Sequence, residues 1–118
     1  MKKVLGVLIP IILILSFAAV ANADTLGTPS YVNAYLYNSS SIRITWDNSV
    51  SGATRYTIQR QTDSGSFVTI ANVLSNVNTY TDTGISNGHT YVYRVYATAG
   101  GESGSPRESY PVEVLYPT

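Results

Sequence analysis

The sequence predicts an all-β fold, a seven-stranded antiparallel β-sandwich. Tyr91, Tyr93 and Val95 alternate with residues of the opposite side, as in a strand with one buried face. Similar short segments recur at intervals of roughly ten residues, separated by turns rich in Gly, Asn and Ser. No segment after residue 23 has a helical period. Several short strands with one apolar face each must stack in two sheets to bury those faces.

The first 23 residues are expected to be a secretory signal peptide of bacterial type. A basic start, Met1 to Lys3, precedes the apolar run Val4 to Val20, and Ala21-Asn22-Ala23 provides a small-residue cleavage site. Cleavage after Ala23 would export the product. The alternative is a retained membrane anchor, although the run is at the lower limit of the roughly 20 residues that span a bilayer. Residues 24–28 are expected to be a short, mobile lead-in.

The first two strands are expected at residues 30–37 and 42–46, on either side of a turn at residues 38–40. Alternation points Val32, Ala34 and Leu36 inward from the first strand. In the second strand, the same alternation points Ile42, Ile44 and Trp46 inward.

The third, fourth and fifth strands are expected at residues 55–61, 67–71 and 79–82. The third strand points Tyr56 and Ile58 inward. The turn that follows it contains an aspartate and a glycine, which favour turn conformations. The fourth strand shows no clear inward face, and a longer connection leads to the fifth.

The sixth strand is expected at residues 90–98, after a corner formed by Asn87 and Gly88. Tyr91 stands where its hydroxyl can bond to the backbone upstream, an arrangement called the tyrosine corner. Residues 99–107 are expected to be a mobile Gly/Ser loop. The seventh strand is expected at residues 108–116, with Val112 and Val114 inward.

The core is therefore expected to consist of large apolar side chains from both sheets. Its central members are expected to be Trp46, Tyr56, Ile58, Ile85, Tyr91, Tyr93 and Val95. Because the sequence contains no cysteine, no disulfide or lipid-modified cysteine is possible, and packing alone must stabilise the domain.

Charge argues against two classes of partner. After residue 23 the chain has five arginines and seven acidic residues, a net charge near −2, with no basic cluster. Nucleic acid and, once the signal is removed, anionic membrane are therefore poor candidates.

The sequence shows no catalytic or metal-binding pattern. His89 is the only histidine and has no second histidine or cysteine to complete a metal site. Asp82 and Gly84 are explained by a turn, because a calcium loop needs several oxygen ligands at close spacing. No nucleophile motif accompanies the serines. We therefore expect no cofactor, no metal and no enzymatic activity.

The strand pattern resembles the fibronectin type III domain, an immunoglobulin-like sandwich, from about Pro29 to Leu115. The motifs that carry the resemblance are Ser41-Ile42-x-Ile44-x-Trp46, Tyr56-x-Ile58-x-Arg60, Tyr80-x-Asp82-x-Gly84-Ile85 and Tyr93-Arg94-Val95-x-Ala97. Asn87-Gly88 stands where the family often has proline. The resemblance implies one domain over residues 29–118, in which strands A, B and E face strands C′, C, F and G. It implies little about activity, because such domains serve as spacers, adhesion modules and binding scaffolds.

The resemblance places the loops at residues 47–53 and 99–107 at the same end of the sandwich. Both loops are small, polar and rich in glycine or serine. If they form a compact ligand site, its side chains are expected to be Asp47, Asn48, Glu102 and Arg107.

The first strand is a candidate edge for association. Edge strands are usually protected by charge or proline, and residues 30–36 contain neither. Tyr31, Asn33 and Tyr35 line its outward face, so a partner strand could pair along this edge. The alternative is that the lead-in covers it.

Together these features predict an exported, non-enzymatic binding or assembly module that contacts protein or polysaccharide through its surface. The alternatives are a passive structural or cell-wall-associated domain, or a subunit of an extracellular filament. The ten tyrosines fit interface use, but they fit ordinary β-propensity equally well.

Overall fold

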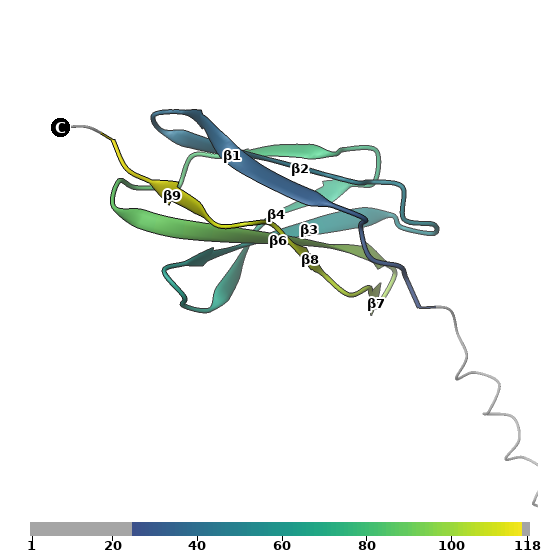
Figure 1. The fold of residues 1–118 in the computed structure, drawn as a ribbon. Coiled ribbons are helices and arrows are strands. Elements are labelled where there is room, and N and C mark those ends of the chain that lie inside the picture. Colours follow the sequence, from purple (N-terminus) through teal and green to yellow (C-terminus); the bar gives the residue numbers. More distant parts are fainter. Residues whose placement is uncertain (1–24, 117–118) are drawn as a thin grey trace, which may run out of the picture.

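The computed structural model describes residues 25–116 as a sandwich of two antiparallel sheets (Figure 1). The expected signal peptide, residues 1–23, lies outside the described range. Within that range the chain forms nine strands and no helix: β1 (Val32–Asn38), β2 (Ser41–Trp46), β3 (Arg55–Thr62), β4 (Phe67–Leu74), β5 (Thr79–Asp82), β6 (His89–Ala99), β7 (Glu102–Ser103), β8 (Arg107–Glu108) and β9 (Val112–Val114).

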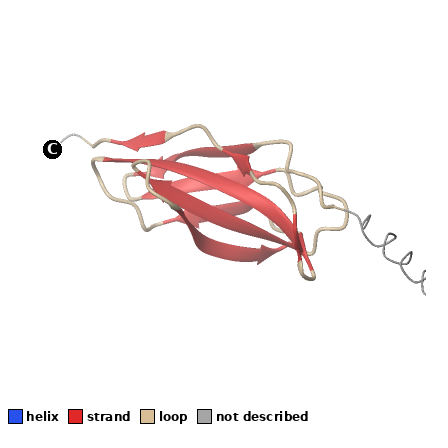
Figure 2. Ribbon diagram, turned by 90° about the horizontal axis from the view of Figure 1, so that it is seen from below, coloured by secondary structure: helices blue, strands red, loops and turns tan. Residues whose placement is uncertain are grey.

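The two sheets have the arrangement that the sequence predicts. The smaller sheet has the order β1-β2-β5, and the larger has the order β4-β3-β6, with β7, β8 and β9 pairing along the other side of β6. Figure 1 shows the smaller sheet above the larger one, and Figure 2 shows the strands from below. β1 is therefore an edge strand, bonded only to β2. This confirms the all-β, two-sheet fold.

The core lies between the facing sheets, where alternate residues point inward. Trp46, Tyr56, Ile58, Tyr93 and Val95 have no exposed surface, and Tyr91 is buried as well. The ring centres of Trp46 and Tyr56 are 6.3 Å apart, and the ring planes are tilted by 49°. The expected core residue Ile85 differs, because it lies beyond the end of β5 and is only partly buried against the core.

Two tyrosine hydroxyls fix the chain where it crosses between sheets. The backbone N–H of Ser86 donates to the hydroxyl of Tyr91 over 2.8 Å, which is the contact expected of a tyrosine corner. The N–H of Val50 donates to the hydroxyl of Tyr56 over 3.1 Å. Each bond satisfies a loop amide that would otherwise lack a partner.

A buried polar cluster joins the two sheets. Arg60 on β3 contacts both carboxylate oxygens of Asp82 on β5, each at 2.9 Å. Tyr93 on β6 donates its hydroxyl to the same carboxylate over 2.6 Å. Burial, and next the neighbouring carboxylate, raise the pKa of the Tyr93 hydroxyl. Asp82 thus acts across the sandwich, and the expectation that a turn alone explains it is too narrow.

The C-terminal strand differs from the expected single strand at residues 108–116. It is divided into β8 and β9, and both pair with β6. Between them the side chain of Ser109 accepts the N–H of Tyr93 over 3.1 Å, in place of a backbone carbonyl. Pro111 has no N–H to donate, so the ladder is interrupted here.

Three further expectations were wrong. Residues 99–107 are not only a loop: β6 and β7 form a hairpin with a two-residue turn at Gly100 and Gly101. Gly100, with φ of 60°, allows this turn. The lead-in is packed: Leu26 lies against the core, and a Cβ at Gly104 would be 2.5 Å from the carbonyl oxygen of Gly27. Leu36 is exposed although it pairs with the buried Ile42, and the register of β1 shifts directly after it.

Candidate binding site at the sandwich edge

The structure does not gather the four expected loop residues into one site. Asp47 and Glu102 line a hollow of about 570 Å³ at one end of the sandwich, together with lead-in residues. Asn48 is occupied elsewhere, since its side-chain amide donates to the carbonyl of Ser75 over 3.1 Å. Arg107 belongs to a different depression.

Asp47 organises the backbone around it. One carboxylate oxygen accepts the N–H and hydroxyl of Ser30, and the other accepts the N–H and hydroxyl of Ser49. The hydrogen bond from the Ser49 hydroxyl, followed by those from Ser30, holds the pKa of Asp47 well below its usual range. Its oxygens are therefore engaged in joining the start of the domain to the loop after β2.

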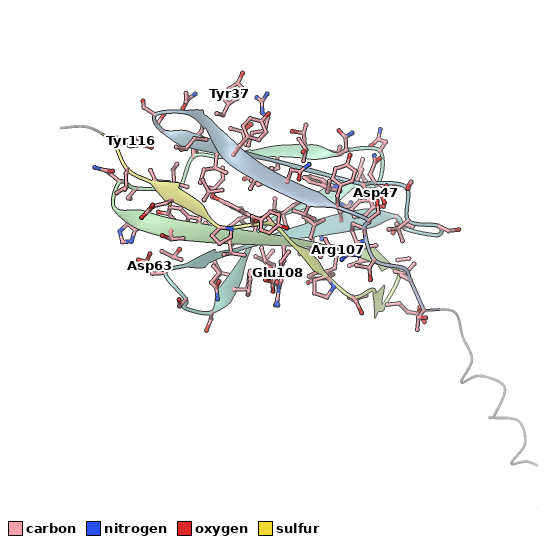
Figure 3. The ribbon with its side chains drawn as sticks, in the orientation of Figure 1. Tyr37, Asp47, Asp63, Arg107, Glu108 and Tyr116 are labelled. Atoms are coloured by element: carbon pink, nitrogen blue, oxygen red, sulfur yellow. The ribbon has the colours of Figure 1, made fainter. Side chains whose placement is uncertain are left out.

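A groove runs between edge strand β1 and the C-terminal segment, and we call it the edge groove. It has a volume of about 390 Å³ and is lined by Ser30, Tyr31, Val32, Asn33, Arg107, Glu108, Ser109 and Tyr110. It brings Arg107, expected in a ligand loop, together with Tyr31 and Asn33, expected on an association edge. Figure 3 shows Arg107 and Glu108 near each other, with Asp47 and Asp63 towards opposite ends of the sandwich.

Arg107 closes the open side of the sandwich at this groove. Its Nε donates to the carbonyl of Pro29 over 2.9 Å, linking β8 to the segment before β1. In residues 25–116, no hydrogen bond engages the two terminal nitrogens of its guanidinium. The N–H groups of these nitrogens are therefore available to donate to another acceptor.

Ser109 sets the direction of its two neighbours. Its N–H donates to the carbonyl of Tyr93 over 2.8 Å, and its side chain is buried. Alternation then turns Glu108 and Tyr110 outward, and Tyr110 is 91% exposed. With Tyr31, which is 45% exposed, the groove has an accessible aromatic ring on each side.

β1 and the residue before it are rich in exposed apolar groups. Eight large apolar side chains are exposed in residues 25–116, and Tyr31, Tyr35, Leu36 and Tyr37 are four of them. The guanidinium of Arg43 lies 3.6 Å from the ring centre of Tyr37, which partly covers that ring. This concentration makes β1 and the residue before it a candidate interaction surface.

The single histidine, His89, does not line this groove. Nδ1 of His89 contacts a carboxylate oxygen of Asp63, and the other oxygen accepts the N–H of Thr90 over 2.9 Å. Both side chains are substantially exposed. Within residues 25–116, no group of three or more His, Cys, Asp or Glu side chains is placed to hold a metal ion. Nor does any helix in that range have the length and apolarity to cross a membrane.

The chain belongs to the fibronectin type III family, because the model of the fibronectin type III domain matches residues 27–114. Among solved structures, an Fn3-like protein from Clostridium thermocellum is 34% identical, with a TM-score of 0.59, and the match covers 76% of this chain and 92% of that one. A segment of chicken tenascin that holds two fibronectin type III domains aligns over 51% of its length and 77% of this chain, with a TM-score of 0.68 at 14% identity, which shows the fold alone.

Two curated relatives are large enzymes. An amylopullulanase from Thermoanaerobacterium thermosulfurigenes is 40% identical over 86 residues, and one from Thermoanaerobacterium saccharolyticum is 38% identical over 86 residues. The match covers 70% of this chain in both cases, but 5% and 7% of the enzymes' lengths. The similarity therefore concerns one small segment of each enzyme.

Proposed function

We propose that this chain is an exported, non-catalytic binding module whose ligand is a polysaccharide held in the edge groove. The observation that carries the proposal is the edge groove itself. It combines two exposed tyrosine rings with the side chains of Asn33, Arg107 and Glu108.

The chemistry of the groove suits a sugar chain. Each pyranose ring has an apolar face of C–H groups and a rim of hydroxyls. Tyr31 and Tyr110 offer flat rings for the apolar faces. Asn33 offers both a donor and acceptors, Arg107 offers donors, and Glu108 offers acceptors. A polar groove with a few aromatic contacts can therefore recognise hydroxyls without performing chemistry on them.

The relatives support a carbohydrate-associated role. A segment similar to this chain occurs in amylopullulanases, whose name points to pullulan as a substrate of the whole enzyme. We extend only the ligand class to this chain, so pullulan is the first polymer to test. The basic start and apolar run of residues 1–20 support export.

The test is binding of the secreted protein to pullulan, amylose and cellulose, measured by affinity electrophoresis and calorimetry. Replacing both Tyr31 and Tyr110 by Ala should weaken binding at least about tenfold, equivalent to about 1.4 kcal/mol. Tyr37→Ala is the matched control for Tyr31, since Tyr37 is 50% exposed, against 45% for Tyr31, and lies outside the groove. Absence of binding to every polymer, or equal loss in the control, would overturn the proposal.

A second candidate function is self-association through β1. This edge is unpaired by any other strand of residues 25–116, and residues 30–42 carry no charge, so two copies can approach without repulsion. Asn33→Lys combined with Tyr35→Lys should reduce the mass measured by light scattering over a concentration series. A monomeric unmodified protein at high concentration would rule this function out. If both candidates fail, a passive structural or cell-wall-associated domain remains.

A further inference from the structure

The outer face of the larger sheet carries a continuous row of polar side chains. Thr69 on β4 is in register with Gln59 on β3, which is in register with Arg94 on β6, which is in register with Glu108 on β8. Side chains at register positions on one face lie next to one another. We call these four residues the outer row.

Hydrogen bonds hold three members of the outer row in fixed orientations. The side-chain amide of Gln59 donates to the hydroxyl of Thr69 over 3.0 Å and accepts from Nε of Arg94 over 2.6 Å. The guanidinium of Arg94 also lies 4.1 Å from the ring centre of Phe67. Because these side chains are already ordered, a ligand would not have to order them on binding.

A shallow groove of about 360 Å³ adjoins the outer row, and we call it the outer groove. It is lined by Gln59, Arg94, Tyr96, Ser103, Gly104 and Pro106. Gln59 has one amide hydrogen and one carbonyl lone pair beyond its two bonds, and Arg94 has its terminal nitrogens. The groove therefore offers both donors and acceptors beside a partly exposed tyrosine ring.

The charge of this surface indicates the class of ligand. Arg94 and Glu108 occupy neighbouring register positions, so this face carries one positive and one negative side chain, which no ion pair joins within residues 25–116. An anionic ligand would meet Glu108, and a cationic ligand would meet Arg94. The remaining groups are amide, hydroxyl and phenol. A neutral, hydroxyl-rich chain fits this pattern better than an acidic polymer or an apolar peptide.

We propose that the outer groove is a second binding site for a neutral polysaccharide, separate from the edge groove. This inference rests on the proposed function and extends it from one site to two. The two surfaces meet at β8, where Arg107 lines the edge groove and Glu108 belongs to both the edge groove and the outer row. One polymer that contacts both sites binds more tightly than a fragment that fills one, because the second contact is intramolecular.

The variant that tests the outer groove is Arg94→Met, which removes the guanidinium but keeps an unbranched apolar side chain over Phe67. Gln59→Ala is a second, independent variant. Arg55→Met is the matched control: this exposed arginine contacts Asn72 on the same sheet but does not line the groove. Circular dichroism and the thermal midpoint verify that each variant is folded.

The measurement is calorimetry with a short neutral oligosaccharide prepared from pullulan, followed by binding of the intact polymer. The unmodified protein is expected to bind about two oligosaccharides, and Arg94→Met and the Tyr31/Tyr110 double variant are each expected to bind one. Affinity for the polymer should fall at least about tenfold in each, because the avidity is lost.

The outcomes separate the two ideas. Suppose that the unmodified protein has one site, which the double tyrosine variant loses and Arg94→Met keeps. This result overturns the proposal for the outer groove and leaves the proposal for the edge groove intact. If instead Arg94→Met loses that site and the tyrosine variant keeps it, the result supports a site in the outer groove and overturns the one proposed in the edge groove. No binding by the unmodified protein overturns both.

Discussion

The inner and outer faces of the larger sheet carry side chains of the same strands, but these side chains make different kinds of contact. On the inner face, Arg60 of β3 and Tyr93 of β6 both bond to the buried carboxylate of Asp82. On the outer face, the next residues along these strands, Gln59 and Arg94, bond to each other beside an open groove. Arg60 and Arg94, which lie on paired strands one register position apart, therefore differ in what their guanidinium groups can still reach.

Surroundings rather than residue type determine what each arginine can do. The inner arginine has a carboxylate partner from the opposite sheet, so its interaction ties the sandwich together. The outer arginine has neutral partners on its own sheet, so removing it should leave the sandwich intact. Stability measurements can separate these roles.

Replacing Asp82 by Ala should have the largest effect. It leaves the guanidinium of Arg60 and the hydroxyl of Tyr93 without their buried partner. We expect a loss of about 3 kcal/mol in the free energy of unfolding, at the lower end for a broken buried pair, because the Arg60 side chain is still 20% exposed. Denaturant unfolding followed by tryptophan fluorescence measures it.

The double variant Arg60→Met with Asp82→Ala is the control for this assignment. It removes the uncompensated charge, so it should be more stable than Asp82→Ala alone. An unchanged denaturation midpoint in Asp82→Ala would show that the cluster does not stabilise the fold.

Tyr91→Phe on the inner face should cost about 1 kcal/mol, because the N–H of Ser86 loses its acceptor. Binding should be unchanged, since Tyr91 lies in the core and lines neither groove. The midpoint of denaturation and the affinity for the polymer are measured on the same sample. A midpoint equal to that of the unmodified protein would contradict a stabilising role for the corner.

Arg94→Met on the outer face should change stability by no more than about 1 kcal/mol. The loss is limited to one hydrogen bond with Gln59 and a half-exposed contact with Phe67. The same unfolding experiment compares this variant with Asp82→Ala. A loss as large as that of Asp82→Ala would assign Arg94 to structure and remove the contrast between the faces.

Protonation of the exposed carboxylate of Asp63 should lower the stability of the fold in acid. Its hydrogen bond from the N–H of Thr90, and next its contact with His89, lower the pKa of Asp63 below the ordinary 3.8. Because the folded state binds this proton less readily than the unfolded state, the stabilisation is present above about pH 4. It is lost as the pH falls through the folded pKa.

Asp63→Asn should therefore flatten the decline of stability below about pH 4. Glu113→Gln is the control, since this exposed carboxylate on β9 accepts no hydrogen bond in residues 25–116. Thermal midpoints measured from pH 2 to pH 7 give the comparison. Parallel curves for Asp63→Asn and the unmodified protein would contradict the prediction.

The sequence predicts the sheets well wherever apolar alternation is uninterrupted. The fifth strand has the expected bounds, Thr79–Asp82, and the sixth is only slightly longer than expected. The C-terminal strand was missed in detail because a serine side chain replaces a backbone acceptor there. The hairpin after β6 had a readable signal, the Gly100-Gly101 pair, which favours a two-residue turn.

The sites were harder to predict because they depend on contacts between distant segments. Asp47 reads as a loop carboxylate, but two serines engage it, one of them before β1. Arg60 gave a usable signal: it follows Tyr56 and Ile58 at inward positions, so it required an acidic partner. The edge groove joins residues almost eighty positions apart, and local periodicity carries no information about such pairs.

The contact between the lead-in and Gly104 also determines how the domain should be produced. Leu26 packs on the core, and the carbonyl of Gly27 leaves no room for a side chain at Gly104. A recombinant fragment that starts at Pro29 would remove this strip and expose the surface beneath it. Such a fragment should be cut sooner by a protease than one that starts at Thr25. The useful N-terminal boundary for expression is therefore several residues earlier than the first strand.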